Sequence, residues 1–236
     1  MFNINIFSDF ACPWCYIGEK RLEEAITKLG MKEDINIYYH SFELDPDAPK
    51  DNKITSSERI AAKYNMPLEK AKKKVAQIDN VGKELGIDFN YSGAIPTNTF
   101  DAHRLMKLAE QEYDNETVQK VNNALFDAYF TRNLIISDPK VLTEIGVKAG
   151  IDEHDITNMF NSDQYKEEVR NDENQAHNLG ITGVPYIIMD SKIAIPGAVS
   201  IEDFMDALNH VKTTKLTESS QSCNAKSCDE NGCNLN

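Results

Sequence analysis

The spacing of apolar residues predicts a strand, a helix and a second strand at the start of the chain. Residues 4–7 form a short β-prone segment that ends at Ser8. Apolar residues then recur at helical spacing over residues 17–29. Over residues 35–42 apolar and polar side chains alternate, which is typical of a strand. This order predicts a βαβ unit whose two strands are parallel.

The middle of the chain is helical almost throughout, from about residue 57 to residue 180. Helix-favouring runs cover residues 68–85, 98–113, 118–129, 141–149 and 165–179. Strand character returns over residues 185–189 and 192–195, which two polar residues separate as in a β-hairpin. A helical stripe of apolar residues follows over residues 201–208.

These elements predict an α/β protein that carries a large all-helical insertion domain. Residues 1–48 and 163–212 form the α/β domain, and residues 49–162 form the insertion. Residues 213–236 are polar, rich in Ser and Asn, and almost free of apolar side chains. Such a segment buries too little apolar surface to fold, so we expect a flexible C-terminal tail that carries cysteines.

Composition and charge narrow the classes of function. The 236 residues include 25 Lys and Arg against 38 Asp and Glu, a formal net charge of −13. Nucleic acids and anionic membranes bind basic surfaces, so we expect neither as a partner. No apolar run approaches the roughly 18 residues that span a bilayer, and residues 1–9 lack the features of a secretory signal. We therefore expect a protein of the cytoplasm.

The cysteines lie only near the two ends of the chain, at Cys12, Cys15, Cys223, Cys228 and Cys233. With none over residues 16–222, no disulfide framework holds the body of the protein together. This pattern fits a reducing compartment, where a close pair of cysteines is more often catalytic or metal-binding than structural.

Cys12-Pro13-Trp14-Cys15 lies between the first predicted strand and the first predicted helix. Unpaired N–H groups and the helix dipole stabilise an anion at a helix N-terminus, and a thiolate at Cys12 is such an anion. Pro13 suits the first helical position, where its missing N–H costs nothing. Cys15 is close enough to attack a mixed disulfide at Cys12. We predict that Cys12 is the exposed nucleophile and Cys15 the more buried resolving thiol.

A zinc site and a pair of ordinary thiols are the alternatives for this motif. The body of the chain offers no second C-x-x-C and no closely spaced pair of histidines to complete four ligands. We therefore predict no metal ligand there and favour redox chemistry.

A second feature supports the redox interpretation. Gly183-Val184-Pro185 precedes an apolar strand, and a proline that opens a strand lies at an edge or in an unusual peptide geometry. In the predicted topology this point comes beside the N-terminus of the first helix. A cis bond before Pro185 would leave the Val184 backbone free to pair with an extended substrate, although a plain turn is the commoner use of this sequence.

Three segments together resemble the DsbA-type thiol–disulfide oxidoreductases, and in particular their FrnE-like cytoplasmic subgroup. They are residues 8–15 (SDFACPWC), 98–105 (NTFDAHRL) and 180–185 (GITGVP). The resemblance implies a thioredoxin-like fold with a helical insertion, Pro185 in cis, and Cys12 and Cys15 cycling between dithiol and disulfide. It implies no cofactor beyond this redox-active disulfide, with glutathione or thioredoxin as candidate electron partners.

Two positions depart from the family pattern. Trp14 stands where periplasmic DsbA has a histidine that helps to stabilise the thiolate, so we expect a weaker oxidant than DsbA. Val199 stands where the FrnE-like group usually has glutamine, which puts a polar role at that position in doubt.

The tail repeats one spacing, C-x4-C, from Cys223 to Cys228 and from Cys228 to Cys233. It resembles an additional motif of some FrnE-like proteins that is thought to exchange with the active-site pair. A tethered thiol has a high local concentration, which favours such an auxiliary redox role. Incidental thiols, or a zinc site completed by an outside ligand, are the alternatives.

We predict a thiol–disulfide oxidoreductase that acts on protein or small-molecule disulfides as reductase, isomerase or oxidase. Kappa-type glutathione transferases and 2-hydroxychromene-2-carboxylate isomerases share the architecture, but they usually carry Ser at the position of Cys12 and lack the resolving cysteine. A metal-binding, chaperone-like module is a third alternative. The sequence assigns no direction of electron flow and no oligomeric state.

Overall fold

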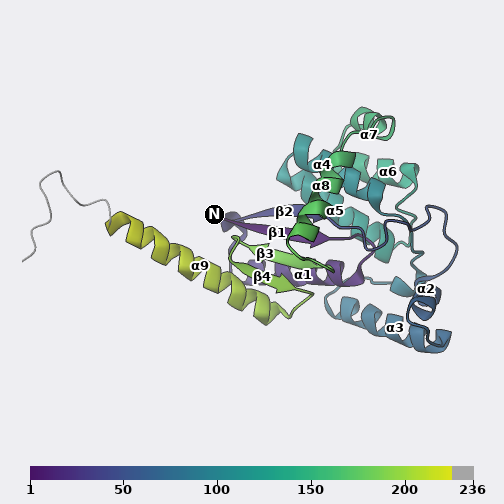
Figure 1. Cartoon of the computed structure of the whole chain (residues 1–236), viewed down its shortest axis with the longest axis horizontal. Coiled ribbons are helices and arrows are strands. Elements are labelled where there is room, and N and C mark those ends of the chain that lie inside the picture. The colour runs from purple at the N-terminus through teal and green to yellow at the C-terminus, as the bar shows by residue number, and fades with distance from the viewer. Residues whose placement is uncertain (225–236) are drawn as a thin grey trace, which may run out of the picture.

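A four-stranded mixed sheet lies at the centre of this computed structural model, which describes residues 1–224 (Figure 1). The strand order is β2-β1-β3-β4. The strands are β1 (Phe2–Ser8), β2 (Ile35–Ser41), β3 (Tyr186–Met189) and β4 (Ile193–Pro196). β1 and β2 are parallel, whereas β3 is antiparallel to both β1 and β4. The predicted parallel pair and the predicted hairpin are both confirmed.

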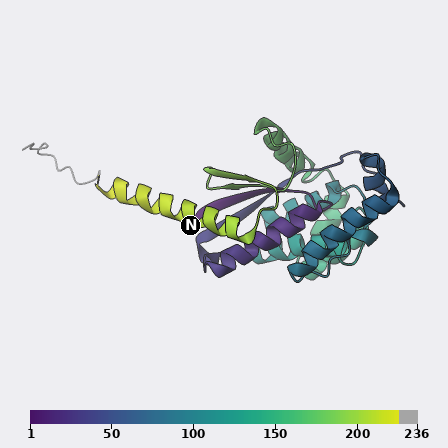
Figure 2. The same cartoon turned by 90° about the horizontal axis from the view of Figure 1, so that it is seen from below.

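The side chains of β1 are divided between two apolar layers. Ile4 and Ile6 belong to the core that contains Leu22 of α1 (Pro13–Lys28) and Phe204 of α9 (Ile201–Asn224). Phe7 packs instead with Ala176 of α8 (Lys166–Asn178). Figure 2 shows α8 on one side of the sheet and α1 with α9 on the other. The fold is therefore an α/β thioredoxin-like sheet covered on both faces.

The helical insertion enters after β2 and leads to α8. Its helices are α2 (Ser56–Lys63), α3 (Leu68–Glu84), α4 (Phe100–Glu112), α5 (Asn115–Phe130), α6 (Pro139–Ala149) and α7 (Glu153–Phe160). The sequence pattern did not separate α7 from its neighbours. Gly150 ends α6 in the left-handed region with φ 110°, and the Asp152 side chain caps α7 by accepting from the His154 N–H. None of the helices described is long and apolar enough to cross a membrane.

Aromatic stacking joins the insertion directly to α1. The Tyr16 ring of α1 lies parallel to the Phe126 ring of α5, with centroids 5.0 Å apart, and Phe130 stacks beside them. These residues share one continuous core with Ile4 and Ile6 of the sheet. Because this packing fixes the insertion against α1, α2 and α3 lie beside the N-terminal end of that helix (Figure 1).

The last helix is longer than predicted. We expected a flexible tail from residue 213, but α9 continues to Asn224. Phe204, Leu208 and Val211 anchor its first part in the core, and no Gly or Pro interrupts the sequence over residues 201–224. The C-terminal end of α9 points away from the rest of the molecule (Figures 1 and 2).

Candidate active site

The Cys-Pro-Trp-Cys sequence forms the start of α1, as predicted. Cys12 is the N-cap residue with extended backbone angles, φ −94° and ψ 113°, and Pro13 is the first helical residue. No side chain caps this terminus, and its first turn contains no acidic residue. The positive end of the helix dipole at Cys12 is therefore not offset by a side-chain cap or by an acidic residue.

Both active-site cysteines are free thiols, and both are buried. Cys12 is 4% exposed and Cys15 is 0% exposed, so the prediction that Cys12 is the exposed thiol is wrong, although Cys15 is the deeper of the two. The Cys12 thiol donates to the Val184 carbonyl oxygen at 3.5 Å. Burial, together with the neighbouring Cys12, raises the pKa of Cys15 well above its ordinary value. Cys15 is therefore a protonated thiol that contacts Cys12.

The Val184–Pro185 peptide bond is cis and directly precedes β3. α1 passes close to it at Gly18, where an added Cβ would lie 3.3 Å from the Pro185 ring and 3.3 Å from Ala198. A larger residue than glycine would push this segment away from α1. Gly18 is therefore a positioning residue that the sequence pattern did not reveal.

A cavity of about 570 Å³ opens in front of Cys12. The redox loop, defined here as residues 9–15, forms one wall with Cys12 and Trp14, and Val184 lies beside them. The helical insertion forms the opposite wall with residues of α2 and α3. These are Arg59, Ile60, Lys63, Lys74, Gln77, Ile78 and Val81. The buried Cys12 sulfur thus lies at a cavity whose walls combine apolar and charged side chains.

Asp9 fixes the redox loop from behind. Its buried carboxylate accepts from the Ala11 N–H at 3.1 Å and from the Leu44 N–H at 2.7 Å. It also lies 3.6 Å from Nε2 of His103, which is buried and has no hydrogen-bond partner. Asp9 therefore joins the redox loop to the segment after β2 and to α4.

Glu19 is a buried acid on the same helix as the cysteines. Ser8 Oγ donates to one of its carboxylate oxygens at 2.9 Å, and Asn122 Nδ2 donates to the other at 2.7 Å. Burial raises the pKa of Glu19 to about 7. The signal in the sequence is an acidic residue on the buried stripe of α1 that contains Cys15, Leu22 and Ile26.

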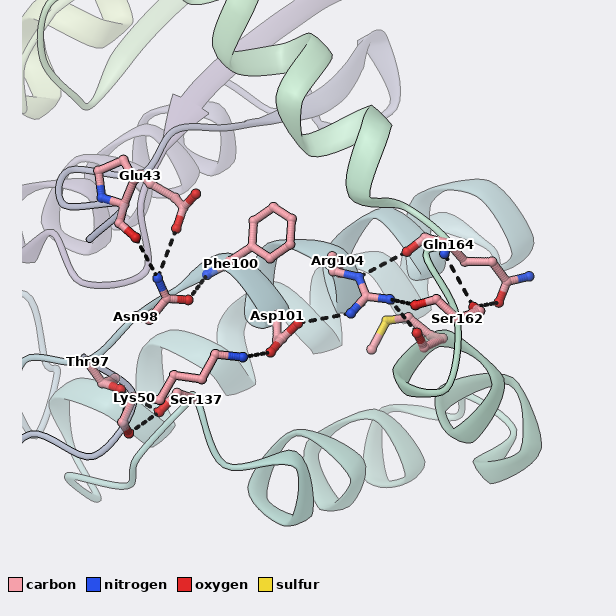
Figure 3. Close-up of polar contacts among 12 residues, drawn as sticks. Glu43, Lys50, Thr97, Asn98, Phe100, Asp101, Arg104, Ser137, Ser162 and Gln164 are labelled. Carbon is pink, nitrogen blue, oxygen red and sulfur yellow. Dashed lines mark hydrogen bonds and ion pairs between the residues drawn. The ribbon is translucent and has the colours of Figure 1, made fainter. Parts of the chain in front are cut away.

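The segment of residues 98–104, here called the α4 hub, is structural (Figure 3). Asp101 accepts from Lys50 and from Arg104, and Arg104 also donates to the carbonyl groups of Met159, Ser162 and Gln164. Asn98 donates to the carbonyl of Pro46. The α4 hub ties the start of the insertion to its end.

Comparison with known proteins shows the family of this chain. Residues 3–209 match the DSBA-like thioredoxin domain family, a range that spans the sheet, α1 and the whole helical insertion. The chain belongs to this family.

Two known proteins align with the chain along nearly its full length. The uncharacterized protein YwbO of Bacillus subtilis (strain 168) is 24% identical over 215 residues, which is 90% of this chain and 98% of YwbO. A probable DsbA oxidoreductase from Streptomyces coelicolor is 27% identical, and its crystal structure covers 100% of both chains with a TM-score of 0.84.

More distant solved structures share the fold alone. Cytosolic disulfide reductase DsbM from Pseudomonas aeruginosa, solved with GSH, is 12% identical with a TM-score of 0.59, covering 92% of this chain and 99% of DsbM. A 2-hydroxychromene-2-carboxylate isomerase is 17% identical with a TM-score of 0.55, covering 95% of this chain and 100% of the isomerase. The shared fold therefore does not distinguish disulfide oxidoreductases from isomerases. Only the active-site residues, here the two thiols, can make that distinction.

The structure brings most of the predicted site residues of this DsbA-like chain together. Cys12, Pro13, Trp14 and Val184 line one cavity. Cys15 follows Cys12 by three residues at the start of α1, and Pro185 directly follows Val184. Cys223 falls in the last turn of α9, and Cys228 and Cys233 lie outside the described residues. Their auxiliary redox role stays a prediction.

Metal-ligating groups do not cluster in the described part of the chain. Among its His, Cys, Asp and Glu side chains, no set of three is arranged to hold a metal ion. The candidate site is therefore made of the two thiols and the groups that surround them.

Proposed function

We propose that this protein is a thiol–disulfide oxidoreductase whose redox centre is the pair Cys12 and Cys15. One observation carries the proposal: two free thiols at the start of α1, the first lining a cavity and the second buried behind it. A nucleophile that faces substrate and a resolving thiol that does not is the arrangement that disulfide exchange needs.

The chemistry follows from this placement. The Cys12 thiolate attacks one sulfur of a substrate disulfide, which forms a mixed disulfide and releases the other sulfur as a thiolate. Cys15 then loses its proton and attacks the Cys12 sulfur, which releases the second substrate thiolate. Two electrons pass to the substrate, and Cys12 and Cys15 become a disulfide. The same steps in reverse oxidise a substrate dithiol.

The substrates proposed are protein or small-molecule disulfides. An extended peptide fits beside the Val184 backbone, and a cavity of about 570 Å³ accommodates a small molecule as well. Glutathione and thioredoxin are the proposed electron partners, and the structure of DsbM with GSH supports testing glutathione first. We further propose a cytoplasmic enzyme of the FrnE-like subgroup, with no cofactor besides the disulfide.

The second sulfur argues against a glutathione transferase or an isomerase. Those enzymes have no use for a resolving thiol, yet Cys15 is held against Cys12 and shielded from solvent. A metal-binding module is less well supported, because the described residues offer no ligand cluster.

Insulin reduction with dithiothreitol or glutathione as donor tests the proposal. The wild type should accelerate the appearance of turbidity, and Cys12→Ser should lower the rate at least about 100-fold because the attacking thiolate is gone. A redox titration of Cys12 and Cys15 should give a two-electron couple. A wild type that fails to react with any disulfide, while folded and fully reduced, would overturn the proposal.

A further inference from the structure

The cavity in front of Cys12 carries basic side chains although the protein as a whole is acidic. The chain has a formal net charge of −13, yet the helical wall of this cavity presents Arg59 and Lys63 of α2 and Lys74 of α3. Residues 70–74 of α3 include four lysines, and of these four Lys74 lines the cavity. The positive charge at the cavity is thus a local feature that the composition of the chain does not predict.

Two carboxylates also line this cavity, and both are engaged within the protein. Asp45 pairs with Arg59 at 2.5 Å, so these two charges offset each other. Asp9 is 1% exposed and accepts from the Ala11 and Leu44 N–H groups. Neither carboxylate is therefore placed to neutralise the lysines of the cavity wall.

The charges of Lys63 and Lys74 remain available to a bound molecule. Across residues 1–224, neither ammonium group forms an ion pair. Lys63 Nζ lies 5.8 Å from the centre of the Tyr64 ring, a contact that leaves its positive charge unneutralised. The field of a charge is stronger in a concave site than on an open surface, because the surrounding protein has a low dielectric constant. The wall formed by α2 and α3 should therefore attract an anion.

We propose that Lys63 and Lys74 select small-molecule disulfides that carry carboxylate groups as substrates of Cys12. The inference rests on the proposed disulfide chemistry and adds the class of substrate. The cavity volume of about 570 Å³ lies in the range of sites that enclose small molecules. Because the lysines lie on the wall opposite the redox loop, a carboxylate can bind there while the disulfide faces Cys12.

The electron balance is that of disulfide exchange. The Cys12 thiolate bonds to one sulfur of the substrate and expels the other half of the substrate as a thiolate. Cys15 then loses its proton and displaces the first half from Cys12. Cys12 and Cys15 are oxidised to a disulfide, and the substrate is reduced to two thiols that each carry a carboxylate.

The dependence of the rate on salt has a diagnostic sign. The net charge of −13 repels an anionic substrate, so salt would accelerate the reaction if this repulsion dominated. Attraction by the two lysines has the opposite sign, and salt weakens it. Coulomb energy falls with distance, so the lysines beside the bound carboxylate should outweigh more distant charges. We therefore expect salt to slow the reaction with an anionic disulfide.

Three disulfides of similar size and different charge test the proposal. They are the dianion dithiodiglycolate, the neutral bis(2-hydroxyethyl) disulfide and the dication cystamine. Each is mixed in excess with the reduced protein, and the fluorescence of Trp14, the sole tryptophan of the chain, follows oxidation of the adjacent thiols. The selectivity is the ratio of the rate with dithiodiglycolate to the rate with the neutral disulfide. It cancels any general change in the reactivity of Cys12.

The double variant Lys63→Gln/Lys74→Gln should lower this selectivity about tenfold at low salt. The ratio of the cystamine rate to the neutral rate should rise in the same variant, because a repulsive charge is gone. Raising the salt from about 20 mM to about 300 mM should slow the wild type with dithiodiglycolate about threefold.

Lys73→Gln is the matched control. It removes the same charge from the same helix, but Lys73 does not line the cavity, so both ratios should stay within about twofold of wild type. A variant that folds poorly loses rate with all three compounds and keeps its ratios.

The outcomes distinguish the two proposals. If none of the three disulfides oxidises the folded, reduced wild type, the proposed function fails before selectivity is tested. If all three react and the double variant keeps the wild-type ratios, the function stands and the selection by Lys63 and Lys74 is wrong. A wild-type rate with dithiodiglycolate that rises with salt would contradict the selection as well.

Discussion

The redox loop and the α4 hub are both rich in functional groups, and they use them in opposite ways. In the redox loop, Cys12 makes one long contact with the Val184 carbonyl and lines an open cavity. In the α4 hub, Arg104 donates to three carbonyl groups and to Asp101 and faces no large cavity. Polar groups whose hydrogen bonds are all made within the protein stabilise the fold. A reactive group that has few partners and lines a cavity can instead react with a bound molecule.

The largest effect should come from removing the resolving thiol. Cys15→Ser leaves the attack by Cys12 intact but removes the sulfur that releases the mixed disulfide, so the adduct should last at least about 100-fold longer than in the wild type. Mass spectrometry after brief exposure to a disulfide peptide should show one covalent peptide per protein. Rapid loss of the adduct in this variant would show that another thiol resolves it.

Arg104→Met tests the α4 hub. It leaves Asp101 with Lys50 alone and takes the buried guanidinium donor away from three carbonyl groups, so the free energy of unfolding should fall by about 4 kcal/mol. Urea denaturation measures this loss, and iodoacetamide should alkylate Cys12 at a rate within about twofold of wild type. Arg132→Met, which removes an exposed pair with Asp127, is the matched control and should cost less than about 1 kcal/mol. A large change in the alkylation rate of Cys12 would show that the α4 hub also controls the reactivity of the redox loop.

Glu19 should make stability depend on pH. Its pKa is raised from 4.5 to about 7 in the folded protein, so folding favours the protonated acid, and this contribution is lost as the pH rises. Relative to Glu19→Gln, the wild type should therefore lose about 2 to 3 kcal/mol of unfolding free energy between pH 5 and pH 8. Urea denaturation of both proteins at the two pH values measures this difference. A gap that does not change with pH would show that Glu19 is ionised throughout.

Removing residues 216–236 should have the smallest effect. The described part of α9 leads away from Cys12, so the truncated protein should reduce a small chromogenic disulfide at a rate within about twofold of wild type (Figure 1). Slower turnover after truncation would instead support the auxiliary redox role predicted for the tail cysteines.

Local patterns were enough to predict the frame of the molecule. The strand before Cys12, the helix after it and the hairpin before α9 each follow from spacing within about ten residues. The start of α1 was predictable for the same reason, because Cys12 and Pro13 carry the signals of a helix N-terminus. The end of α9 was not, because its polar second half shows no apolar stripe.

The missed parts of the site depend on contacts between distant segments. Cys12 contacts the Val184 carbonyl, and residues of α2 and α3 line the cavity in front of it; all of these lie far from Cys12 in the sequence. Glu19 is recognisable as an acid on an apolar stripe, but its hydrogen-bond donors are Ser8 on β1 and Asn122 on α5. The spacing of residues along one helix does not reveal contacts with segments that are distant in the sequence, so neither the surroundings of Cys12 nor the partners of Glu19 could be predicted.

The pairing of β1 with β3 has a consequence for the newly made protein. Ile4 lies opposite Met189, so the sheet closes only after the ribosome has delivered nearly the whole polypeptide. Until then the Val184 carbonyl is not in place beside Cys12, and the two sulfurs emerge uncovered. The two thiols of a nascent chain are therefore more exposed to oxidants than the same thiols in the folded protein, where both are buried.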